Sequence, residues 1–93
     1  MSAARVRSAS APVGVVLAIT PNGSITVRAA GSDAVAEGTR VADPRGRFRG
    51  RVVRVFGPVS RPYLSVRARR PLSIEEGASL LGRTLVLDAG EGP

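Results

Sequence analysis

Short runs of alternating apolar and polar residues, each ended by a turn signal, are the feature that most restricts the fold of this chain. Val13–Ile19 is rich in β-branched residues and lies between prolines. Ile25–Arg28 alternates after Pro21–Ser24, where Asn and Gly accept the backbone angles of a tight turn. A periodicity of two is that of strands. These two segments therefore predict an antiparallel hairpin.

The same pattern continues through the rest of the chain. Arg40–Ala42 predicts a short strand, and Asp43–Gly46 has the x-Pro-x-Gly composition of a turn. Arg47–Val55, Pro62–Arg69 and Thr84–Asp88 predict three further strands. About six short strands in a chain of this size favour an all-β fold closed into a small barrel, because closure leaves no exposed sheet edge.

Residue parity divides two of these strands into an inner and an outer set. The outer set is Arg47, Arg49, Arg51, Ser65, Arg67 and Arg69, and the inner set is Phe48, Gly50, Val52, Leu64, Val66 and Ala68. After Val52 the pattern changes, because Val53 and Val55 fall on the arginine parity. We therefore expect a bulge at this point, or burial on both faces near the strand end.

One segment has the composition of a helix. Ser73 is a suitable N-cap, Glu75 and Glu76 lie where a first turn favours acidic residues, and Gly82 is a stop signal. Gly77 lowers the helix propensity of the segment. We expect at most one short helix, of about two turns.

The length of 93 residues predicts a single domain. We expect a flexible basic lead-in at residues 1–11, the β-barrel domain at residues 12–88 and a flexible tail at residues 89–93. The longest apolar run, Val13–Ile19, is far shorter than the roughly 20 residues that a spanning helix needs. The first residues also lack the apolar stretch of a signal peptide. We expect a cytoplasmic protein that does not engage a membrane.

Composition argues against catalysis. The chain has no histidine and no cysteine, which removes the usual acid–base group at neutral pH, thiolate chemistry and the commonest metal ligand. Glu75 and Glu76 are adjacent, but neighbours on a helix point in different directions and do not act as a pair. No glycine-rich segment has the spacing of a phosphate-binding loop. We expect no enzymatic activity, no cofactor and no metal.

All 14 basic residues are arginine, and against 7 acidic residues they give a net charge of +7. Such a charge suggests a polyanionic partner, most often nucleic acid. The candidate RNA contacts are Arg45, Arg47, Arg49, Arg51, Arg67 and Arg69. The alternative is that these arginines are only the solvent-facing side of barrel strands. Few aromatic residues are present to stack on bases, so electrostatic contact is better supported than base recognition.

The segment Val55–Tyr63 is too apolar and too stiff for an ordinary hairpin turn. It holds two of the three aromatic residues, Phe56 and Tyr63, and two prolines. Prolines restrict a loop and lower the cost of ordering it on binding, and Tyr and Arg are frequent at protein interfaces. A protein-binding loop is therefore one interpretation. The other is that Phe56, Val59 and Tyr63 close the end of the barrel.

The sequence of this loop resembles a known family. Val55–Val59 (VFGPV) followed by Pro62–Val66 (PYLSV) is similar to the signature of the small glycine/arginine-rich-family subunit of H/ACA ribonucleoproteins, in its archaeal form. Gly50–Arg54 resembles the approach to that loop, and Leu81–Leu85 resembles the family's closing segment. The similarity covers roughly positions 12 to 88, with the loop as its most specific part. The long glycine–arginine tails of eukaryotic members are absent.

This resemblance implies a six-stranded barrel like those of translation factors and a role without catalysis. Family members bind the catalytic, dyskerin-like pseudouridine synthase subunit and aid substrate RNA loading and product release, in rRNA pseudouridylation within the archaeal cell. They meet guide and substrate RNA mostly indirectly. Transferred to this chain, the partner surface comprises Val55, Phe56, Gly57, Pro58, Val59, Pro62, Tyr63 and Leu64. A stand-alone RNA-binding β-barrel that acts through its arginine-rich face is the alternative.

Overall fold

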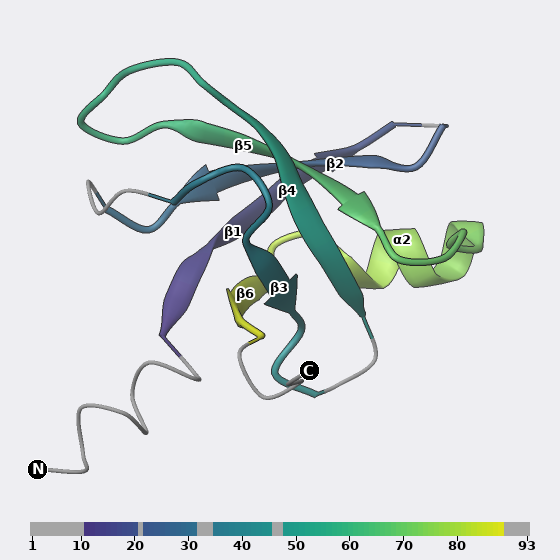
Figure 1. Cartoon of the computed structure of the whole chain (residues 1–93). Coiled ribbons are helices and arrows are strands. Elements are labelled where there is room, and N and C mark those ends of the chain that lie inside the picture. Colours follow the sequence, from purple (N-terminus) through teal and green to yellow (C-terminus); the bar gives the residue numbers. More distant parts are fainter. Residues whose placement is uncertain (1–10, 21, 32–34, 46–47, 89–93) are drawn as a thin grey trace, which may run out of the picture.

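The computed structural model describes residues 11–20, 22–31, 35–45 and 48–88. In these ranges the chain forms β1 (Pro12–Ile19), β2 (Ser24–Ala29), β3 (Arg40–Ala42), β4 (Arg49–Phe56), β5 (Tyr63–Ala68), α2 (Ile74–Leu80) and β6 (Thr84–Leu87). The strands form a closed barrel in the order β1-β2-β5-β4-β3-β6, and every neighbouring pair is antiparallel. The prediction of a closed six-stranded barrel with one short helix is confirmed (Figure 1).

The barrel closes because β6 pairs with both β1 and β3. Gly14 of β1 lies opposite Leu85, and Val41 of β3 lies opposite Leu87. Ala11 also takes part, because its carbonyl accepts a hydrogen bond of 3.0 Å from the Leu87 amide. Backbone pairing therefore begins one residue before the expected domain start at position 12. The rest of the expected lead-in, and the expected tail, lie outside the described residues.

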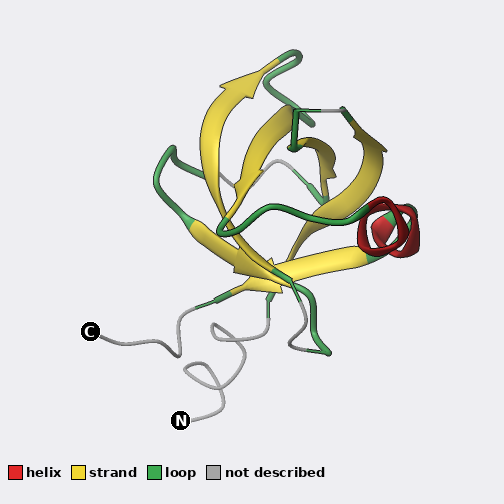
Figure 2. Ribbon diagram, turned by 90° about the vertical axis from the view of Figure 1, so that its right-hand side faces the viewer, coloured by secondary structure: helices red, strands yellow, loops and turns green. Residues whose placement is uncertain are grey.

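The core consists of the inward side chains of the strands together with one residue of the helix. It comprises Val13, Val16, Ile25, Val27, Val41, Phe48, Val52, Leu64, Val66, Leu80 and Leu85. Complete burial of one aliphatic side chain of this kind stabilises a fold by about 1.5–3 kcal/mol. Figure 2 shows the strands curving around this interior, with α2 beside them. The predicted inward set is confirmed, with Ala68 only partly buried at its edge.

A bulge in β4 explains the change of pattern after Val52. The β4–β5 register shifts between Val52 and Arg54, so Val53 is the extra residue and is 43% exposed. After the shift, Arg54 lies opposite Ser65. The extra residue reverses the parity of the strand. Of the two expected alternatives, a bulge or burial on both faces, the structure has the bulge, and its consequence is that the side chain of Phe56 lies on the outer surface.

Gly50 allows the neighbouring strands β4 and β5 to approach one another closely. A Cβ atom at this position would lie 2.7 Å from the Arg67 carbonyl oxygen and 2.9 Å from Cζ of Phe48. Real Cβ atoms do not make such contacts with backbone. The glycine therefore allows β4 to pass close to β5 while the ring of Phe48 fills the interior beneath it.

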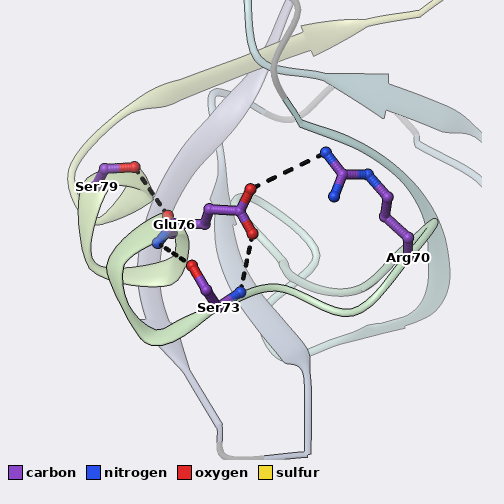
Figure 3. Close-up of polar contacts among 4 residues, drawn as sticks. All are labelled: Arg70, Ser73, Glu76 and Ser79. Carbon is purple, nitrogen blue, oxygen red and sulfur yellow. Dashed lines mark hydrogen bonds and ion pairs between the residues drawn. The ribbon is translucent and has the colours of Figure 1, made fainter.

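The helix α2 begins with a capping box. The Ser73 hydroxyl accepts a hydrogen bond of 3.0 Å from the Glu76 amide, and the Glu76 carboxylate accepts one of 2.9 Å from the Ser73 amide. Arg70 forms an ion pair of 4.0 Å with the same carboxylate, and the Ser79 hydroxyl donates to the Glu76 carbonyl (Figure 3). This cap satisfies two backbone groups that would otherwise lack partners. The predicted N-cap at Ser73 is confirmed.

A buried carboxylate links the end of α2 to the turn after β3. Asp43 is 5% exposed and forms an ion pair of 3.8 Å with Arg83. The same arginine donates a hydrogen bond of 2.8 Å from its Nε to the carbonyl of Ser79 near the end of the helix. Arg83 therefore holds the helix against the barrel.

Candidate functional site

The β4–β5 loop extends beyond the barrel wall and carries apolar side chains that do not enter the core. Val59 is 91% exposed at its tip, and Phe56 and Val55 are 38% and 37% exposed. Figure 1 shows the loop projecting on the side of the molecule away from α2. The high exposure of Val59 does not fit the alternative in which these side chains close the barrel end.

Two aromatic rings and two guanidinium groups form a continuous stack at the base of this loop. Phe56 of β4 lies opposite Tyr63 of β5, and their ring centroids are 5.7 Å apart with 24° between the planes. Tyr63 in turn lies opposite Arg28 of β2, whose guanidinium is 5.0 Å from the ring centroid. The guanidinium of Arg54 lies over the ring of Phe56, 5.5 Å from its centroid. We call this arrangement the aromatic ladder.

The aromatic ladder holds the two strands of the hairpin together on their outer face. An aromatic pair contributes about 0.5–1.5 kcal/mol beyond its buried area, and an exposed cation–π contact about 0.5–1 kcal/mol. A hydrogen bond of 3.1 Å from the Arg28 guanidinium to the Tyr63 hydroxyl adds a polar link. The ladder is therefore a rigid support for the loop.

Gly57 fits tightly beside the ladder. Its φ of +90° is one that residues with side chains rarely adopt. A Cβ atom there would also lie 2.8 Å from Cδ2 of Tyr63. Only glycine allows the chain to leave β4 over the face of the tyrosine ring.

The far side of the loop is tied to the end of β2. The Arg61 Nε donates a hydrogen bond of 3.1 Å to the Ala29 carbonyl, and the Ala29 amide donates one of 2.9 Å to the Pro62 carbonyl. The loop is therefore anchored at both ends, with its apolar tip left in solvent. A surface held in this way loses little conformational freedom on binding a partner.

The structure exposes most of the predicted partner residues, but not all on the same face of the hairpin. Phe56 and Tyr63 face the outer surface, whereas Val55 lies opposite the buried Leu64 on the inner face. Val55, Phe56, Gly57, Pro58 and Val59 are exposed. Pro62 and Tyr63 are half-buried at the base of the loop. Leu64 is fully buried and belongs to the core, so its side chain does not contribute to this surface.

Sequence reasoning did not include Arg28 and Arg54 in this surface. Both became visible only through strand register, because Arg28 lies opposite Tyr63 and Arg54 follows the bulge. The outward parity of Arg28 in its strand is a signal in the sequence, but parity does not identify the neighbouring strand.

Several of the predicted arginines also lie on the outer face of the barrel. Arg49, Arg51, Arg67 and Arg69 are exposed there, and Arg45 is exposed in the turn after β3. Arg47 lies outside the described residues. The Arg69 amide donates a hydrogen bond of 2.8 Å to the Arg49 carbonyl, so these two arginines lie side by side.

Register brings one further arginine into this group. Arg51 lies opposite Arg67 of β5 on one side and opposite Arg40 of β3 on the other. Arg40 was not among the predicted contacts, because the sequence alone does not reveal that β3 pairs with β4. We call Arg40, Arg51 and Arg67 the arginine row.

The described residues contain no group of three or more His, Cys, Asp or Glu side chains that could hold a metal ion. In the same part of the chain, no helix combines the length and apolar character needed to cross a membrane.

No protein-family model matches the chain, and comparison with curated proteins finds no significant match.

Proposed function

We propose that this chain is a non-catalytic accessory subunit of an H/ACA RNA-guided pseudouridine synthase. It docks on the catalytic synthase subunit through the outer surface of the β4–β5 loop, and it aids substrate RNA loading and product release. The proposal rests on the resemblance of Val55–Val59 and Pro62–Val66 to the signature of that family. The six-stranded barrel supports it, because the family has a fold of this kind.

The observation that carries the proposal is an apolar loop tip on a rigid base. Val59 is almost completely exposed, while Phe56 and Tyr63 below it are stacked and flanked by arginines. Aromatic residues and arginine dominate the binding energy of protein interfaces, especially where they surround an apolar centre. A loop that is already ordered also avoids part of the entropy loss on association.

Binding to the synthase subunit in the absence of RNA tests the proposal. We expect the purified chain to bind an archaeal synthase subunit in isothermal titration calorimetry. Val59→Asp should weaken this binding at least tenfold, because it places a charge at the centre of the apolar contact. The barrel should remain folded, because Val59 is 91% exposed and contributes nothing to the core.

Ile74→Asp is the matched control. Ile74 is also 91% exposed, but it lies at the start of α2, on the side away from the loop (Figure 1). The control introduces the same charge and should leave the affinity unchanged. Equal affinity of Val59→Asp and the wild type would contradict the assignment of the loop as the docking surface.

A further inference from the structure

The arginine row places three like charges directly opposite one another across β3, β4 and β5. Directly opposed residues of an antiparallel pair share one face, with Cβ atoms about 4.5–5.5 Å apart. Arg40, Arg51 and Arg67 are all exposed on that face. Three neighbouring strands therefore present their guanidinium groups to the same region of solvent.

Among the described residues, one carboxylate lies beside the row, and it pairs with an arginine outside the row. Among the residues that the structure describes, none forms an ion pair with Arg40, Arg51 or Arg67. The Asp88 amide donates a hydrogen bond of 3.0 Å to the Arg40 carbonyl, so Asp88 is the carboxylate beside the row. Its side chain pairs with Arg49, at 3.9 Å, and Arg49 lies two residues from Arg51 along β4. Like charges directly opposite one another destabilise a sheet. A ligand that carries closely spaced negative charges would relieve this repulsion.

We propose that the outer face of β3, β4 and β5 binds the phosphate backbone of a nucleic-acid strand, with the arginine row as its centre. Neighbouring strands are about 4.8 Å apart, so the row extends over roughly 10 Å. Arg49 and Arg69 lie about 7 Å further along the same strands. Each strand of a B-form duplex carries one charge for about every 3.4 Å of helix axis, so a surface of this size can meet more than one phosphate. Guanidinium groups bind phosphate through paired hydrogen bonds.

The surface recognises phosphate and not bases. Phe56 and Tyr63 stack on one another, and the guanidinium groups of Arg54 and Arg28 lie over the rings of Phe56 and Tyr63, respectively. These rings are therefore already occupied and offer no open platform for a base. We expect binding with little sequence preference and with similar affinity for RNA and DNA.

The arginine row is separate from the proposed docking loop, because the two surfaces share no side chain. The row also crosses the strands, because it includes Arg40 of β3. A nucleic-acid contact that ran only along β4 and β5 would not include this residue. Arg40 therefore gives the sharpest test of the row. If the nucleic acid followed β4 and β5 alone, substitution of Arg40 would not remove a phosphate contact.

Fluorescence anisotropy of the full chain with labelled oligouridylate and oligothymidylate of about 12 nucleotides tests the proposal. Titrations between about 50 and 200 mM salt give the slope of log K against log salt. The slope is negative, and each lost phosphate contact reduces its magnitude by about 0.7 for a single strand. This corresponds to about a fivefold loss of affinity near 0.1 M salt. Arg40→Gln should show this change. Arg51→Gln combined with Arg67→Gln should show about twice the change in slope and a loss of more than tenfold.

Arg61→Gln combined with Arg70→Gln is the matched control, because it removes the same charge outside the row. Arg61 bonds to the Ala29 carbonyl and Arg70 pairs with Glu76. The control should lose affinity by no more than about twofold, because the overall positive field is weaker.

The Arg51/Arg67 variant should have a melting temperature no lower than that of the wild type, because it removes like-charge repulsion. Its loss of binding would then not reflect unfolding.

Equal affinities of the Arg51/Arg67 variant and the control would overturn the proposal. So would wild-type affinity for Arg40→Gln, or equally tight binding of polyglutamate, which would indicate an acidic polypeptide as the partner. A preference of more than tenfold for RNA over DNA would contradict a site that reads phosphate alone. Val59→Asp should lower nucleic-acid affinity by no more than about twofold, through its effect on the overall field, so failure of this proposal and failure of the docking proposal are distinguishable.

Discussion

The rings of Phe56 and Tyr63 stack across the β4–β5 pair, with their centroids 5.7 Å apart. This contact exists because a bulge after Val52 shifts the register of β4 and turns Phe56 outward. Arg54 and Arg28 complete the aromatic ladder on either side. The ladder connects the two surfaces described above, because the loop rises from it and the arginine row lies further along the same strands.

Tyr63→Phe tests the polar end of the ladder. The substitution keeps the ring stack but removes the hydroxyl that accepts a hydrogen bond from Arg28. The Nε of Arg28 is buried and has no hydrogen-bond partner in the described part of the chain, so the guanidinium would lose a bond that it cannot easily replace. We expect a loss of about 1–2 kcal/mol in the free energy of unfolding, measured with urea. An unchanged midpoint would show that this hydrogen bond does not stabilise the ladder.

Gly57→Ala should disturb the base of the loop. The positive φ of Gly57 and the 2.8 Å approach of a Cβ atom to the tyrosine ring both oppose a side chain here. We expect a destabilisation of about 1–2 kcal/mol. Because Tyr63 is the single tyrosine of the chain, its near-ultraviolet circular dichroism reports the movement directly. Gly31→Ala is the control, because no atom lies within 4 Å of a Cβ there; an equal effect of both substitutions would contradict the prediction.

Gly77→Ala should stabilise the protein. Gly77 is buried in the middle of α2, and an added Cβ would lie 3.5 Å from Cδ1 of Ile19, an ordinary van der Waals distance. Alanine has a higher helix propensity than glycine by about 0.5–1 kcal/mol. The expected gain in unfolding free energy is of that size, visible as a higher melting temperature. A lower melting temperature would mean that the helix cannot accept even one methyl group against β1.

Ser73→Ala should remove the N-cap of α2. The hydroxyl accepts the Glu76 amide at 3.0 Å, and its loss leaves that amide without its partner. We expect a destabilisation of about 1 kcal/mol in urea unfolding. Ser79→Ala removes a hydroxyl from the same helix that only donates to the Glu76 carbonyl. This control should have little effect, and a loss as large as that of Ser73→Ala would argue against a specific role of the cap.

The elements that were predicted correctly depend on neighbouring residues. The hairpin of β1 and β2, the cap at Ser73 and the inward position of Phe48 follow from turn chemistry, capping and parity. The bulge after Val52 was also visible, because Val53 and Val55 fall on the parity of the arginines. Parity also indicated that Leu64 faces inward, and the structure buries it in the core although the family resemblance assigns it to the partner surface.

The contacts that were missed depend on pairing between strands that are distant in the sequence. Arg28 meets Tyr63 because β2 pairs with β5, and Arg40 meets Arg51 because β3 pairs with β4 in one particular register. A register shift of one residue would have turned these arginines to the other face. The alternation of residues within one strand does not indicate which other strand will pair with it in the sheet.

The sequence by itself determined the all-β class, the position of the helix and the two groups of residues that do not belong to a core, namely the apolar loop and the outward arginines. These properties follow from periodicity and local backbone chemistry. Only the tertiary structure decided that Arg28 and Arg54 flank the aromatic rings and that three arginines align across three strands. The physical reason is that closure of the barrel selects the strand order and register, and this selection is a property of the whole chain.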